Sequence, residues 1–285
     1  MSQVPPSAIR RLMAVHLVLA MVPLGMGFMP IDYRTLLIVL GLASIPFSQI
    51  MLLSIGVGMI ATGKVLQKAF ITAIAGAFLA FWCAWGEVMM STDASVGATV
   101  SVFLRIFCVF LVLLAILSAV MAGMSRLVGT IRLPRSSDLP LAEPRFRFSL
   151  FTLLAVATTS ALILGLVRAS RDTVGSQDIM ASVVELTLGA IIFALNTLVA
   201  IWATLGSGHV GRRLCLVFFV SVLLGFSFAI GTGMSSFGEP WWLFLSFPLV
   251  VIVPTTIVAL SLLYLRRLGF RLVPPQISVR ADLTD

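Results

Sequence analysis

The sequence predicts an all-α membrane protein, a bundle of about eight transmembrane helices arranged as two tandem four-helix repeats in parallel orientation. Three observations support this fold class. Of 285 residues, 60% are hydrophobic and only 11% are charged, whereas a soluble domain carries roughly 25% charged residues. Eight apolar runs are long enough to cross a bilayer, and the basic residues gather in alternate connections between these runs.

The composition also excludes several classes of protein. With so few charges, a soluble enzyme could not keep its folded surface wetted, and a disordered or disulfide-rich chain would be far less apolar. The net charge of +8 is spread over short clusters, which argues against a nucleic-acid partner. Cys83, Cys108 and Cys215 each lie inside an apolar run without CxxC or histidine spacing, so we expect buried thiols and no metal or cofactor.

Each span is predicted from length, because a helix needs about 20 mostly apolar residues to cross the hydrocarbon. The predicted spans are Leu12–Met29, Leu36–Ala61, Ala69–Trp85, Ile106–Gly123, Leu150–Val167, Leu186–Leu205, Leu214–Ile230 and Trp241–Tyr264. The runs lack the period-2 alternation of barrel strands, and helices satisfy their own backbone hydrogen bonds in lipid. A cleaved signal peptide is the alternative for the first run, although no small-x-small cleavage site follows it.

Charge distribution predicts the orientation of these spans. When connections are numbered alternately, most of the 19 basic residues fall on the side of the N-terminus. The acidic residues between spans mostly fall on the opposite side: Asp32, Glu87, Asp93, Asp172, Asp178, Glu185 and Glu239. By the positive-inside rule, this predicts a multi-pass protein of the cell (inner) membrane with both termini in the cytoplasm.

Internal similarity predicts the two repeats. Residues Gln49–Gly86 align without gaps onto Ala194–Gly231, and each half ends in a similar Arg-, Leu- and Gly-containing block, residues 126–134 and 267–274. Because four spans per half is an even number, the halves share one orientation about an axis along the membrane normal. The predicted organisation is an N-terminus 1–11, a first half 12–124, a cytoplasmic linker 125–147, a second half 148–265 and a cytoplasmic tail 266–285.

A family resemblance lies at the start of the second half. The segment Phe146-Arg147-Phe148-Ser149-Leu150-Phe151-Thr152-Leu153-Leu154, with the span that follows it to Arg168, resembles the F-S-L-R-T-L-L segment of uncharacterised integral membrane proteins of planctomycete bacteria. Here Phe151 stands where arginine is usual, and the segment lies in mid-chain. The resemblance implies an inner-membrane protein of that type and brings no activity with it.

Intramembrane polar residues are the first candidates for function, because each is costly in lipid unless it is paired or hydrated. Arg105 directly precedes an apolar run, so its guanidinium either reaches the outer boundary or forms a partly buried ion pair with Glu185 or Glu87. Gln49 and Asn196 lie near the middle of equivalent helices, where their amides either pack between helices or line a polar path. His16 lies one turn inside the first span, without a readable partner for proton transfer.

No catalytic motif, paired intramembrane carboxylate or metal-ligand spacing appears in the sequence. We therefore expect a non-enzymatic membrane component, such as a scaffold or assembly partner, in contact with the lipid bilayer and other membrane proteins. The alternative is a small-solute or lipid transporter with its path between the two halves. A hydrated interface between the halves, lined by Gln49, Asn196 or Arg105, would favour the transporter, and a dry, tightly packed interface would favour the scaffold.

Overall fold

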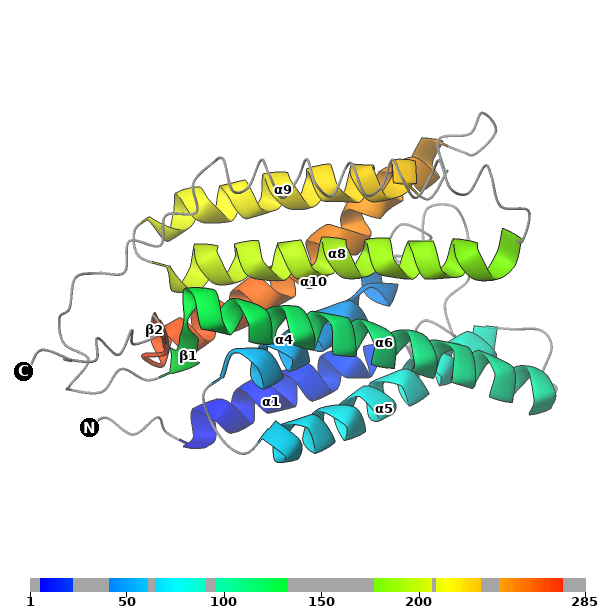
Figure 1. The fold of residues 1–285 in the computed structure, drawn as a ribbon, viewed down its shortest axis with the longest axis horizontal. Helices are drawn as coiled ribbons and strands as arrows, with labels where there is room; N and C mark the ends of the chain where they lie inside the picture. The colour runs from blue at the N-terminus through cyan, green and yellow to red at the C-terminus, as the bar shows by residue number, and fades with distance from the viewer. Residues whose placement is uncertain are drawn as a thin grey trace, which may run out of the picture.

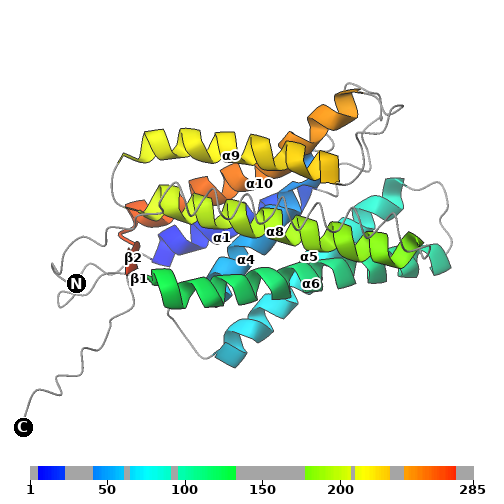
Figure 2. The ribbon, with the colours of Figure 1, turned by 45° about the horizontal axis from the view of Figure 1, so that its top comes forward.

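A computed structural model describes residues 6–22, 41–60, 65–90, 96–132, 177–206, 209–231 and 241–273. These ranges form a bundle of long helices with one short ribbon at one end (Figures 1 and 2). The described helices are α1 (Pro6–Ala20), α4 (Ile45–Gly58), α5 (Val65–Met90), α6 (Val96–Val128), α8 (Gln177–Leu205), α9 (Val210–Gly231) and α10 (Trp241–Arg267). The ribbon pairs β1 (Thr130–Arg132) antiparallel with β2 (Arg271–Val273).

Within the described ranges, five helical stretches are long and apolar enough to cross a membrane: Gly41–Gly58, Ile106–Arg126, Thr187–Leu205, Val210–Ile230 and Ser246–Arg267. A shorter apolar stretch, Phe70–Cys83, lies inside α5. These findings confirm the prediction of a helical protein of the membrane type. Of the other predicted spans, the first is described only as far as residue 22, and the fifth, Leu150–Val167, lies outside the described residues.

Several helices extend beyond the predicted apolar runs. α6 begins ten residues before Ile106 and continues to Val128, inside the predicted linker. β1 and β2 follow directly after α6 and α10, and a glycine with positive φ makes each turn: Gly129 (φ 116°) and Gly269 (φ 96°). Glycine adopts this left-handed conformation without steric cost, which is why it commonly ends helices.

The helices form two groups that meet along the middle of the bundle (Figure 1). In the first group, α4, α5 and α6 pack against one another, and α1 packs on α4. In the second group, α8, α9 and α10 pack against one another. The groups meet where α4 contacts α10 and α8, where α6 contacts α8, and where α1 hydrogen-bonds to α10.

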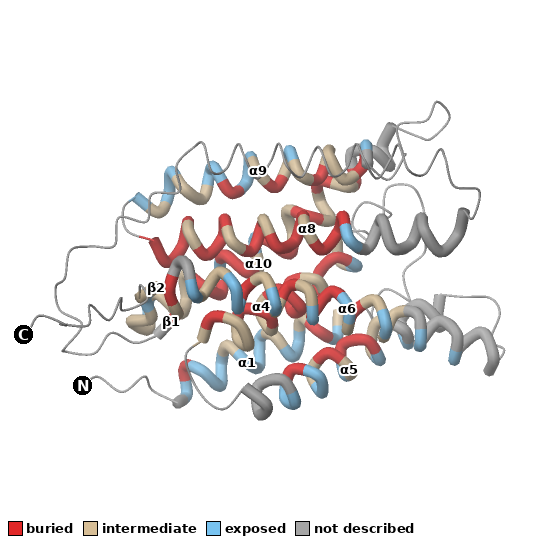
Figure 3. The backbone as a smooth tube through the Cα atoms, viewed as in Figure 1, coloured by how far each residue is buried: buried red, intermediate tan, exposed pale blue. Residues whose placement is uncertain are grey.

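The most buried residues lie where the two groups meet, on α4, α8 and α10 (Figure 3). Met51 of α4, Leu117 of α6 and Val258 of α10 are almost completely buried in one continuous apolar cluster. The rings of Phe47 and Phe193 stack across the junction with centroids 4.8 Å apart. Because lipid tails are as apolar as these side chains, close van der Waals packing rather than the hydrophobic effect holds such helices together.

With the exception of Arg105, which lies in the first part of α6, the charged residues of the described ranges separate by end. Basic residues lie where α1, α5 and α9 begin, where α6 and α10 end, and on the ribbon: Arg10, Arg11, Lys68, Arg126, Arg132, Arg212, Arg213, Arg266, Arg267 and Arg271. This is the end at which Figure 1 shows β1 and β2. The described acidic residues, Glu87, Asp178 and Glu185, lie near the end of α5 and the start of α8, at the opposite end.

Candidate functional site

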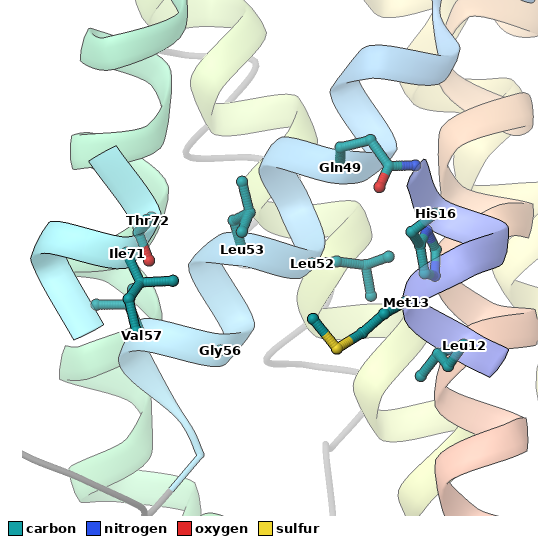
Figure 4. Close-up of a pocket in the computed structure, with 10 residues that line it drawn as sticks. All are labelled: Leu12, Met13, His16, Gln49, Leu52, Leu53, Gly56, Val57, Ile71 and Thr72. Atoms are coloured by element: carbon teal, nitrogen blue, oxygen red, sulfur yellow. The ribbon is translucent and has the colours of Figure 1, made fainter. Parts of the chain in front are cut away.

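A pocket of about 350 Å³ lies on α4, between α1 and α5 (Figure 4). Its walls are mainly apolar, and three polar side chains interrupt them. The lining residues are Leu12, Met13 and His16 of α1, Gln49, Leu52, Leu53, Gly56 and Val57 of α4, and Ile71 and Thr72 of α5. Two of the residues that the sequence singles out, His16 and Gln49, therefore meet in one pocket.

A hydrogen bond joins His16 of α1 to α10. The Nε2 atom lies 3.0 Å from the hydroxyl oxygen of Ser261 on α10, and this hydroxyl oxygen also lies 2.7 Å from the carbonyl oxygen of Ile257. The hydroxyl has a single proton, which either Nε2 or the Ile257 carbonyl can accept, so both neutral tautomers of His16 are compatible with this contact. The Nδ1 atom is buried and has no hydrogen-bond partner within 3.5 Å, and the side chain with which the ring interacts in the pocket is Gln49.

Gln49 forms the other half of the polar end of the pocket. The residue is buried, and its amide nitrogen donates to the Ser48 hydroxyl at 3.1 Å. The Ser48 hydroxyl in turn donates to the carbonyl of Ile45 at 2.6 Å. The Gln49 amide points toward α1 and lies beside the His16 ring (Figure 4). A carboxamide and an imidazole thus lie side by side among apolar side chains, an arrangement that can hydrogen-bond a neutral ligand.

Asn196 lies elsewhere and serves helix packing. It is fully buried on α8, where its Oδ1 accepts a hydrogen bond from Ser221 of α9 at 2.8 Å. Its Nδ2 donates to the carbonyl of Ile192 at 3.1 Å. Asn196 therefore joins two helices of the same group and does not face Gln49.

The candidate ion pair remains a prediction, because the side chains of Arg105, Glu87 and Glu185 lie outside the described part. Their backbones are placed: Glu87 is in the last turn of α5, Arg105 lies one residue before the apolar stretch of α6, and Glu185 is near the start of α8. α6 contacts both α5 and α8, so the three residues lie on neighbouring helices.

Two arginines cap the C-terminal end of α8, a feature that sequence reasoning did not foresee. Arg266 of α10 donates from Nη1 to the carbonyls of Thr204 (2.6 Å) and Gly206 (3.1 Å). The Arg213 guanidinium of α9 lies 4.7 Å from the centre of the Trp202 ring. The last carbonyls of a helix have no partners within the helix and carry partial negative charge, so cations stabilise this end. The charge pattern predicts basic residues here but cannot indicate which carbonyls they bind.

The fold and the pocket define a helical protein with several helices able to cross a membrane. Among the described residues there is no group of three or more histidine, cysteine, aspartate or glutamate side chains that could hold a metal ion. No protein family, curated protein or solved structure matches this chain.

Proposed function

We propose that the protein is a non-enzymatic, multi-pass membrane component, a scaffold or assembly partner built from two parallel four-helix halves. The observation that carries this proposal is the apolar contact between the helix groups. Ile50, Leu117 and Val258 are nearly inaccessible there. A transport path between the halves would need polar or hydrated walls, because a polar solute is costly to place against bare hydrocarbon.

The pattern of helix contacts supports the tandem repeat. If α4, α5 and α6 are exchanged with α8, α9 and α10, every contact within one group becomes a contact within the other. The contact of α4 with α10 likewise becomes the contact of α8 with α6. A twofold axis running along the bundle produces this exchange, and such an axis relates parallel repeats.

The register of the ribbon supports the same axis. The aligned ends of the two halves place Gly129 opposite Gly269 and Pro134 opposite Pro274, so that counterparts are 140 residues apart. The strand pairs are Thr130↔Val273, Ile131↔Leu272 and Arg132↔Arg271. A twofold axis that passes between the second and third of these pairs moves each residue onto its counterpart in the other half. The strands pair in the same register before and after this rotation. The ribbon therefore joins the ends of the two proposed halves at the basic end, which we assign to the cytoplasm.

Cysteine accessibility tests the dry junction. In a chain with Cys83, Cys108 and Cys215 replaced by alanine, single cysteines at Ile50 and Val258 should not react with a water-soluble thiosulfonate in intact membranes. Arg267→Cys, at an exposed position of the basic end, is the reactive control. Rapid modification at Ile50 or Val258, with Arg267→Cys also reactive, would contradict the scaffold and favour a transporter.

The assembly role has its own test. Mild-detergent extracts of the native membrane, separated by native electrophoresis, should show the chain in a complex larger than the purified chain in the same detergent. Migration of the extracted chain at the size of the purified one would contradict an assembly role, whatever the result of cysteine labelling.

A further inference from the structure

We propose that Arg213, Arg266 and Arg271 bind the phosphate of an anionic phospholipid, such as phosphatidylglycerol, and that one acyl chain of this lipid lies in the groove between α9 and α10. The group that is recognised is a phosphate, and we assign it to a lipid headgroup rather than to a soluble phosphate. The inference requires only that the chain lies in a membrane, so it does not depend on the proposed scaffold role.

Three guanidinium groups gather where α8 ends. Arg266 of α10 donates from Nη1 to the carbonyl of Gly206 at 3.1 Å, and a Cβ added to Gly206 would lie 2.5 Å from Nη1 of Arg213. Arg271 of β2 donates from Nη1 to the backbone carbonyl of Arg266 at 2.8 Å. The positive charges of Arg271 and Arg213 repel that of Arg266. A bound anion would relieve this repulsion, because opposite charges at short range favour one another's charged form.

Two of these arginines keep hydrogen-bond donors for a ligand. Among the described residues, Arg266 and Arg271 donate from Nη1 alone, which leaves Nε and Nη2 of each guanidinium for another acceptor. The acidic residues of the described ranges lie at the opposite end of the bundle, so none of them is a counter-ion here. Planar guanidinium groups match the oxygens of a phosphate and form charge-assisted hydrogen bonds with them. The cluster therefore suits a phosphate.

An apolar groove of about 190 Å³ begins beside this cluster and runs between α9 and α10. Leu214, which directly follows Arg213, lines the groove on α9, and Leu263, three residues before Arg266, lines it on α10. α9 begins at the basic end and α10 ends there, so the rest of the groove lies deeper in the bilayer. A lipid with its phosphate at the arginines and a chain in the groove is therefore oriented as it is in the surrounding leaflet.

The walls of the groove suit an acyl chain. Phe218 and Leu260 line it and are 55% and 61% exposed, so the groove opens toward lipid. No lining residue is charged. The hydroxyls of Ser221 and Thr255 each donate to the carbonyl four residues earlier in their own helix, so they need no partner from a ligand. The volume is small, and it holds part of one chain rather than a whole lipid.

Two sets of variants test the headgroup and the chain separately. Arg213→Gln and Arg271→Gln each remove one guanidinium, and Arg126→Gln, at an exposed position near the end of α6, removes the same charge from the same end of the bundle. Thr256→Phe places a ring in the groove, because Thr256 is an exposed residue of its wall. Leu223→Phe adds a ring at an exposed position of α9 that does not line the groove.

The experiment uses the purified full chain in phosphatidylcholine nanodiscs and a phosphatidylglycerol with a diazirine in one acyl chain. Photolabelling should map by mass spectrometry to residues 214–221 and 252–263. Arg213→Gln and Arg271→Gln should each lower this labelling about tenfold, the factor that corresponds to one charged hydrogen bond. Thr256→Phe should also lower it, and Arg126→Gln and Leu223→Phe should keep the wild-type level.

Undiminished labelling in a folded Arg213→Gln or Arg271→Gln variant, judged by gel filtration and helical circular dichroism, would overturn the phosphate site. Undiminished labelling in folded Thr256→Phe would overturn the placement of the acyl chain in the groove.

Two further measurements identify the source of the phosphate. A phosphatidylcholine with the same diazirine chain should label the wild-type groove about tenfold less, because the arginines repel its choline cation. Inorganic phosphate should leave labelling by phosphatidylglycerol unchanged when sodium chloride of equal ionic strength is the reference. Equal labelling by the two lipids would overturn the choice of an anionic lipid. Displacement by inorganic phosphate and not by chloride would assign the site to a soluble phosphate and overturn the lipid assignment.

Discussion

Replacing Gly58 by alanine should separate α4 from α6 and destabilise the fold. A Cβ at this position would lie 2.5 Å from the Cβ of Met121 and 2.7 Å from the backbone nitrogen of Ala122. Because carbon atoms in contact are about 3.5–4.0 Å apart, the two helices would have to move apart by about 1 to 1.5 Å. Overpacking of this kind costs about 1–3 kcal/mol. Most of the clash is with backbone, so no side-chain rotation relieves it.

The assay is equilibrium unfolding by SDS in mixed micelles, followed by circular dichroism. Gly56→Ala is the control, two residues earlier on the same helix, where an added Cβ meets no atom within 4 Å. Both variants exchange one helical glycine for alanine, so their intrinsic helix propensities change alike. We expect Gly58→Ala to unfold at a clearly lower SDS fraction than Gly56→Ala. Coincident unfolding curves for the two variants would refute the close approach of α4 and α6.

Three further predictions concern the described contacts. Arg266→Gln should lower the free energy of unfolding by about 1.5–3 kcal/mol, because it removes charged hydrogen bonds to two helix-end carbonyls. Arg267→Gln, at the exposed neighbouring position, should change the free energy of unfolding by less than about 0.5 kcal/mol. Equal changes in the two variants would contradict the cap. A double-mutant cycle of Asn196→Ala and Ser221→Ala should give a coupling of about 0.6 kcal/mol, and strict additivity would exclude their hydrogen bond. Ile131→Ala removes a side chain that is 0% exposed and should lower the free energy of unfolding by about 2–5 kcal/mol in the same assay. An unchanged unfolding midpoint would contradict the burial of Ile131.

The linker and the helix ends show where sequence reasoning falls short. The start of the predicted linker extends α6 and then forms β1, and Ile131 is fully buried, its backbone nitrogen donating to the Met59 carbonyl at 2.9 Å. An apolar residue in a polar, basic segment carries no periodic signal, so its burial could not be predicted. Its partner strand also lies some 140 residues further along the chain.

The candidate residues were predicted unequally well. Packing of Asn196 was one of its two predicted roles, and its hydrogen bond to Ser221 supplies the partner. His16 had no readable partner, because Ser261 lies 245 residues away and has no signature of its own. The pairing of His16 with Gln49 was equally hidden, since both were singled out for separate reasons and only the packing of α1 on α4 brings them together.

The sequence by itself determined that the chain forms long apolar helices and that basic and acidic residues, Arg105 excepted, separate to opposite ends. Both features depend on whether a segment is more stable in lipid or in water. The composition and length of that segment measure this preference directly. The tertiary structure alone decided which helices meet, which carbonyls the arginines cap and which polar atoms share a pocket. Among apolar helices in lipid, partners are chosen by close packing and a few hydrogen bonds, and neither leaves a periodic trace in the sequence.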